Sequence, residues 1–257
     1  MIMINQMLVK ETRELIKSYK MLMVPLIFIV ILIMQPIMLK LLPTLLQQEG
    51  TLPPGTVITM AEPLVGDVLG SILSQFEQLG VITIVLIMMG TIVEERASGV
   101  AAMVLVKPIG REKYYFTKLV VYTLLVIISF FVAIGVCGYY TDVIYSGVEW
   151  GHVFKGAAVY LPNLFLVVSI VLFFSSFLKK QLAVAVSSIV LYNILVIIPK
   201  YLGEFISSIS PSAVVSSANK ILSGVPDVEF LKPIIAVSIL ALAFILSGWI
   251  IFKKQEI

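Results

Sequence analysis

Apolar residues are arranged in six runs along the chain, separated by short polar segments. A transmembrane helix needs about 20 mostly apolar residues, and each run has about that length. We therefore predict an all-α, polytopic membrane protein in which residues 1–257 form a single transmembrane domain. The predicted spans are residues 21–42, 71–93, 116–140, 157–177, 182–201 and 233–252. The second is the least apolar, because Gln75, Glu77 and Gln78 precede its strongly apolar part, residues 79–93.

The overall composition agrees with a membrane protein. Hydrophobic residues make up 60% of the chain and charged residues 13%, whereas a soluble domain has about 45–50% and about 25%. The net charge of +3 is too small to indicate a nucleic-acid partner. With one cysteine, Cys137, and one histidine, His152, the chain cannot build a His/Cys metal cluster.

Lysine and arginine predict the orientation, because cytoplasmic loops are enriched in them. Six spans place both termini on one side, and that side collects 13 of the 18 basic residues. We therefore expect both termini in the cytoplasm. A multi-pass protein of a prokaryotic plasma membrane is the expected setting. Residues 4–20 have apolar positions near helical period with lysines and an arginine between them, which predicts a basic amphipathic helix in the headgroup plane.

The segment 93–118, VEERASGVAAMVLVKPIGREKYYFTK, is the largest predicted cytoplasmic loop. It places Glu94 and Glu95 directly below a helix end and contains an apolar run, residues 100–106. An apolar run in a water-facing loop needs a membrane or a partner to cover it.

This loop resembles the corresponding loop of the ABC transporter type-2 permeases, in which an acidic-basic cluster is followed by a glycine, an amphipathic helix, a proline and a basic residue. The matching residues are Glu94, Glu95 and Arg96, then Gly99, residues 101–106, Pro108 and Lys118, with spacings of nine residues from Gly99 to Pro108 and ten from Pro108 to Lys118. Val100 and Ala102 depart from the family pattern, which has threonine and glutamate there.

The resemblance implies a permease that works as a dimer, with a second copy of itself or a related permease, on two copies of an ATPase subunit. ATP and magnesium would be bound by that partner, and no cofactor is expected in this chain, which lacks a G-x-x-x-x-G-K-[ST] phosphate loop. Membrane lipid is the other expected partner. The loop would act as the coupling helix, with contacts from Glu94, Glu95, Arg96, Gly99, Met103, Pro108 and Arg111.

Three amides within the spans are candidates for a substrate pathway: Gln35, Asn163 and Asn193. Their distances from the cytoplasmic helix ends, about 17–21 Å at 1.5 Å per residue, predict similar depths. Hydrogen bonds between helices are the alternative role. In the outer segment 202–232, Pro211 and Gly224 bracket a predicted short helix, residues 212–223, that acts as an exit gate or simply covers the bundle.

The expected function is an exporter subunit that moves an amphiphilic, lipid-like or peptide substrate. A non-transporting sensor or immunity module paired with an ATPase is a second reading. An intramembrane protease is disfavoured because His152 and the Glu94–Glu95 pair are predicted on opposite sides. An ion-coupled transporter is disfavoured because we expect no Asp, Glu, Lys or Arg deep within a span.

Overall fold

The computed structural model describes residues 2–48, 63–100 and 110–255, and these are almost entirely helical. The predicted all-α class and the six membrane helices are confirmed, the six being α2, α3, α6, α7, α8 and α11. The helices are α1 (Ile2–Lys17), α2 (Lys20–Gln48), α3 (Val65–Met88), α4 (Val93–Ala97), α6 (Arg111–Tyr145), α7 (Trp150–Phe177), α8 (Gln181–Ile197), the 3-10 helix η1 (Ile198–Tyr201), α9 (Glu204–Ser208), α10 (Pro211–Leu222) and α11 (Leu231–Lys254).

The membrane helices extend beyond the apolar runs that predicted them. Helix α3 begins at Val65, six residues before the expected boundary, because Asp67 in its first turn accepts a hydrogen bond from the backbone N–H of Leu64 (3.2 Å). This bond partners one of the N–H groups that a helix start leaves free. The residues from Val65 to Gln78 are therefore helical, and Glu77 lies well inside the helix.

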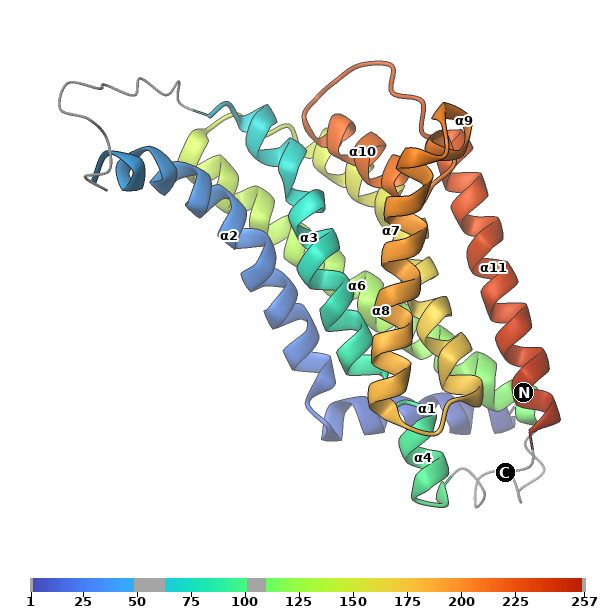
Figure 1. The fold of residues 1–257 in the computed structure, drawn as a ribbon. Coiled ribbons are helices and arrows are strands. Elements are labelled where there is room, and N and C mark those ends of the chain that lie inside the picture. The colour runs from blue at the N-terminus through green and yellow to red at the C-terminus, as the bar shows by residue number, and fades with distance from the viewer. Residues whose placement is uncertain (1, 49–62, 101–109, 256–257) are drawn as a thin grey trace.

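The bundle has two different ends (Figure 1). At one, which we call the α1 end, α1 lies across the bundle, and α4 and the C-terminal end of α11 are found at the same end. A left-handed residue, Tyr19 (φ 56°), makes the sharp turn from α1 into α2. At the other, the α10 end, α10 lies over the outer parts of α3 and α7, and the short helix α9 lies beside η1 and α10 (Figure 1). The α1 end is the one predicted to face the cytoplasm.

Helix α7 lies at the centre of the bundle, where it contacts α3, α6, α8, α10 and α11. The aromatic core beside it is organised around Phe76 of α3, whose ring lies 4.9 Å from that of Phe28, 5.2 Å from Phe130 and 6.0 Å from Tyr160. These four side chains join α2, α3, α6 and α7 in one buried cluster. By contrast, only 22–28% of the residues in the most apolar stretches of α2, α8 and α11 are buried in the bundle. Most of the surface of these three helices is therefore available to lipid or to another chain.

Cys137 is buried in α6 and its thiol donates a hydrogen bond to the carbonyl oxygen of Leu32 in α2 (3.3 Å). Leu32 lies four residues before Pro36, and a proline has no N–H with which to close that turn of the helix. The thiol therefore supplies a donor to a carbonyl that the proline leaves free. Nearby, the Tyr145 hydroxyl donates to the carbonyl of Pro36 itself (3.1 Å).

The short helix predicted in the outer segment is present as α10. Ser210 precedes it and accepts from the Ala213 N–H, Pro211 is its first residue, and Gly224 follows its last turn with φ 78°. These are the residue types that start and stop helices. Close packing on α7 requires Gly156, where a Cβ atom would lie 2.6 Å from Leu222 Cγ and 3.0 Å from the Ala218 carbonyl oxygen.

We expect Gly156→Ala to destabilise the packing of α10 on α7 by about 1–3 kcal/mol, because the added methyl group forces the two helices apart. Thermal unfolding of the purified protein in detergent measures the effect. Gly151→Ala is the matched control on the same helix, since nothing lies within 4 Å of its added Cβ. Equal melting temperatures for the two variants would contradict this account of α10.

Candidate functional site

A buried cluster of charges joins three helices at the α1 end. The ammonium group of Lys118 in α6 lies 3.0 Å from Glu11 Oε2 in α1 and 3.1 Å from Glu95 Oε1 in α4. All three side chains are 7% exposed or less. The other oxygen of Glu95 accepts a hydrogen bond from the Tyr114 hydroxyl. Burying charges is favourable only when each is paired and hydrogen-bonded, and here every charge has a partner.

Lys10 completes this charge cluster from the solvent side. Its ammonium group pairs with Glu95 and lies 3.2 Å from Glu11 and 3.5 Å from Glu14. Burial alone would lower the pKa of Lys10, but the hydrogen bond to Glu95 and the charges of the three carboxylates outweigh it and raise the pKa above its ordinary value. Although Glu11, Glu14 and Glu95 come close enough together to hold a metal ion, the two lysines occupy the space between them as counter-charges.

Two arginines of the predicted coupling segment bind the last carbonyls of other helices. Arg96 Nη2 donates to the carbonyls of Ser175 (3.1 Å) and Ser176 (2.9 Å) at the end of α7. Arg111 Nη1 donates to the carbonyls of Lys253 (2.8 Å) and Gln255 (2.7 Å) at the end of α11. Helix C-termini leave such carbonyls unpaired and carry partial negative charge. The two arginines therefore hold the ends of α7 and α11, and their contact with a partner stays a prediction.

The rest of the predicted coupling segment is only partly within the described residues. Gly99 follows α4 with φ 74°, a left-handed conformation suited to the residue after a helix end. Met103, Pro108 and the expected amphipathic helix, residues 101–106, lie outside the described residues. Glu94 is exposed, and its carboxylate accepts a hydrogen bond from Gln181 Nε2 (2.7 Å).

Beside Glu94, the α1 end is hollowed between α4 and the turn that joins α7 to α8. This hollow of about 790 Å³ is lined by Val93, Glu94, Ala97, Ser98, Lys179, Lys180 and Gln181. It combines an acidic side chain, two basic side chains and an apolar wall, and it adjoins the segment predicted to couple to the ATPase. We call it the α4 hollow.

His152 lies at the opposite end of the bundle from Glu94 and Glu95, near the start of α7, with its Nδ1 3.0 Å from Glu149 Oε2. The predicted separation of the histidine from the glutamate pair is therefore present in the fold. A protease site that combines them cannot form within one copy of the chain.

The three amides that we predicted in a substrate pathway do not come together. Gln35 Nε2 donates to Ser71 Oγ (2.8 Å), which joins α2 to α3. Asn163 is buried and donates to the Tyr192 hydroxyl (2.8 Å) in α8. Asn193 is exposed and donates to Ile189 of its own helix. Consecutive residues of a helix point about 100° apart, so Tyr192 faces the bundle and Asn193 faces away.

Glu77 is the polar residue that sequence reasoning placed incorrectly. Glu77 lies farther inside its helix than we expected, because α3 begins early and Glu77 is 12 residues from its start, about 18 Å along the axis. Its Oε1 accepts a hydrogen bond from the Tyr192 hydroxyl (2.9 Å), which also accepts from Asn163. The only signal in the sequence was the polar group Gln75–Gln78 at the start of the second apolar run.

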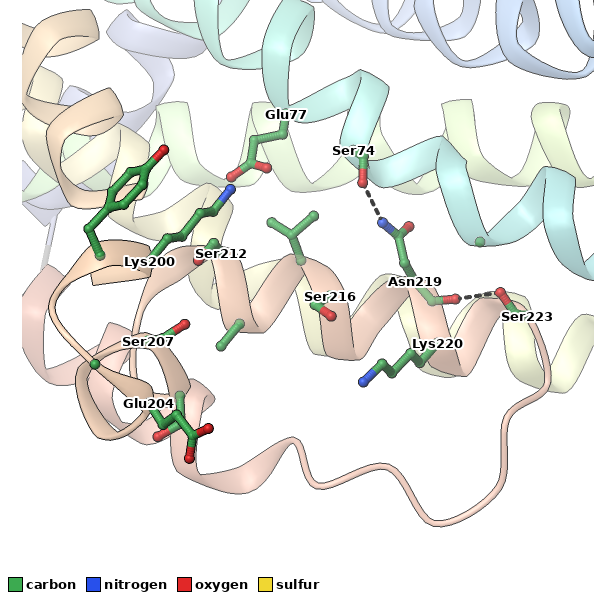
Figure 2. A pocket seen from close by; sticks show the side chains of 16 residues that line it. Ser74, Glu77, Lys200, Glu204, Ser207, Ser212, Ser216, Asn219, Lys220 and Ser223 are labelled. Carbon is green, nitrogen blue, oxygen red and sulfur yellow. Dashed lines mark hydrogen bonds between the residues drawn. The ribbon is translucent and has the colours of Figure 1, made fainter. Parts of the chain in front are cut away.

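Glu77 lies at the edge of a polar cavity of about 980 Å³ at the α10 end, which we call the outer cavity (Figure 2). Its walls come from α3, from η1 and α9, and from α10. Asn219 of α10 donates to Ser74 Oγ of α3 (2.8 Å) and so fixes two of these walls to each other. The other charged side chains that line it are Lys200, Glu204 and Lys220.

A model of the ABC-2 family transporter proteins matches residues 6–256, nearly the whole chain. The uncharacterized transmembrane protein YxlG of Bacillus subtilis (strain 168) is 27% identical over 154 residues. That match covers 60% of this chain and 60% of the relative's length.

We expect Lys118→Met to destabilise the protein by roughly 3–5 kcal/mol, because it leaves Glu11 and Glu95 buried with too little positive charge. Thermal unfolding in detergent measures the loss. Lys113→Met, on the exposed face of the same helix, is the matched control, and its free energy of unfolding should lie within about 0.5 kcal/mol of that of the wild type. Adding Glu11→Gln to Lys118→Met should recover part of the loss, and no recovery would contradict the pairing.

Proposed function

The chain belongs to the ABC-2 family transporter proteins, and from this membership we propose that it is the membrane permease subunit of an ATP-driven exporter. The observation that carries the proposal is the family match over residues 6–256 together with six membrane helices. In our proposal the substrate is amphiphilic and the α1 end faces the cytoplasm. The membrane is the plasma membrane of a prokaryote.

ATP hydrolysis takes place in a separate subunit in this proposal. The chain has no phosphate-binding loop of the type that ATPases use, and the family implies an ATPase partner. The α4 hollow supports the α1 end as the docking face, because Glu94, Lys179 and Lys180 surround it with charges of both signs. Charges on a rim give a partner surface its register and specificity.

The charge cluster gives the docking face a rigid connection to the bundle. Movement of α4 displaces Glu95, and Glu95 is paired with Lys118 of α6 and Lys10 of α1. Arg96 connects the same short helix to the end of α7. We propose that closure of two ATPase subunits pushes on the segment after α4 and that these contacts distribute the push to α1, α6 and α7.

A dimer follows from the same proposal, formed with a second copy or a related permease. The largely unburied surfaces of α2, α8 and α11 support it. Exposed Asn193 adds to the case for α8, because an amide in a lipid-facing position leaves hydrogen-bonding groups without partners.

We expect Glu94→Lys to reduce co-purification with the partner ATPase by about tenfold, equivalent to about 1.4 kcal/mol, because it reverses a charge on the rim of the docking face. Glu94 is a sharper test than Glu95, whose side chain is buried in the charge cluster. The measurement is pull-down of the co-expressed ATPase and its stimulated hydrolysis in proteoliposomes.

Glu229→Lys, at the α10 end, is the control and should bind the ATPase as the wild type does. Unchanged binding and hydrolysis in Glu94→Lys would refute the docking role of this face. A complex that hydrolyses ATP normally and moves no amphiphile would instead indicate a sensor or immunity module.

A further inference from the structure

We propose that the outer cavity binds a phosphoethanolamine-type zwitterionic head group, with its ammonium on Glu77 and its phosphate between Lys200 and Lys220. The inference rests on the proposed function and gives its substrate a chemical class. The cavity volume of about 980 Å³ is at the upper end of the roughly 300–1,000 Å³ typical of ligand pockets.

Glu77 is positioned to accept a hydrogen bond from a cation. The Tyr192 hydroxyl binds Oε1 and is itself held by Asn163, so the carboxylate has a fixed direction. Among the described residues no side chain is bonded to Oε2, and Lys200, the cation directed toward Glu77, does not form a direct ion pair with it. A carboxylate at this depth is costly unless it serves a ligand or finds a counter-charge.

Lys200 and Lys220 supply positive charge to the same cavity from two different walls. Lys200 extends from η1 toward the side of the cavity where Glu77 lies, and Lys220 extends from α10 (Figure 2). Neither forms an ion pair with another described residue. The hydroxyls of Ser207 and Ser216 line the space as well, and they are hydrogen-bond donors for phosphate oxygens.

The charges of both signs favour a zwitterion over an ion of one sign. A simple anion between the lysines would lie near the negative charge of Glu77, and a simple cation on Glu77 would lie near Lys200 with no anion between them. A head group with both charges pairs with both sides. A primary ammonium is favoured over a quaternary one, because only the former can donate a hydrogen bond to the free carboxylate oxygen.

The surface of α3 beside the cavity accommodates an acyl chain. Ser74 and Gln78 are exposed on α3 near Glu77, and the C-terminal half of the same helix then exposes Leu79, Ile82 and Leu86. These apolar side chains are 40–50% exposed. A polar hollow followed by an apolar stripe on one helix matches a lipid whose head enters the cavity and whose tail stays in the bilayer.

The test is binding of short-chain lipids to the purified full chain in detergent, measured by native mass spectrometry and by thermal stabilisation. Dihexanoyl phosphatidylethanolamine should bind about tenfold more tightly than the phosphatidylglycerol or phosphatidylcholine of the same chain length. This difference corresponds to the one charge-assisted hydrogen bond that its ammonium group donates to Glu77. Competition by free O-phosphoethanolamine would show that the head group suffices, and failure to compete would show that the acyl chain is also needed. Both results support the site.

Two variants test the contributions of the negative and the positive side chains of the cavity separately. Glu77→Gln should lose about tenfold in phosphatidylethanolamine affinity and should not weaken the binding of phosphatidylglycerol, whereas Lys220→Gln should weaken both. Glu229→Gln and Lys232→Gln are matched controls, since these residues form an ion pair outside the cavity (2.9 Å) and should leave binding unchanged. Lys220 is exposed and its substitution does not disturb the Glu77 hydrogen bonds, so it remains informative if Glu77→Gln does not fold.

Equal affinity for the three lipids, or unchanged phosphatidylethanolamine affinity in Glu77→Gln and Lys220→Gln, would overturn the inference. Because binding is measured without an ATPase, that result would leave the permease proposal standing. The permease proposal is tested separately by Glu94→Lys.

Discussion

Lys118 lies at the junction of α1, α4 and α6, and its buried ammonium group determines how these helices fit together. A single charge with 1% exposure must be surrounded by carboxylates, and the chain brings Glu11 from a position 107 residues away to meet it. Glu95 satisfies the same requirement from α4. An apolar cluster of equal volume would hold the three helices together, but it would allow them to pack in several relative positions. Paired charges allow few such positions, because each displacement of one helix leaves a charge without its partner in a low-dielectric interior.

Periodicity and composition were sufficient to predict the number and order of the membrane helices. A lipid bilayer requires each spanning helix to have a certain length and apolar content, and both can be seen in the sequence. They also predicted α10, whose start and stop residues are local signals. The partners of the polar residues were not predictable in this way. The contacts of Arg96 and Arg111 with the ends of α7 and α11 could not be predicted, because nothing in the sequence indicates that these helix ends approach the two side chains.

Glu77 illustrates the same limit more sharply. Its position within the helix depends on where α3 begins, and the hydrogen bond to Asp67 that partners this start is not visible in the apolar content. Depth along a helix could be counted for Asn163 and Asn193, but direction around the helix could not be inferred for residues in mostly apolar segments. One step along α8 separates Tyr192, which joins a buried network, from Asn193, which faces outward.

The thiol of Cys137 has a practical consequence for spectroscopy. Site-specific attachment of fluorophores or spin labels normally starts from a protein without cysteines, and this chain has one to remove. Replacement by alanine would strip the Leu32 carbonyl of its donor next to Pro36, whereas serine keeps a donor of similar size. A serine background is therefore the one in which probes on α2 and α6 will report the undisturbed arrangement.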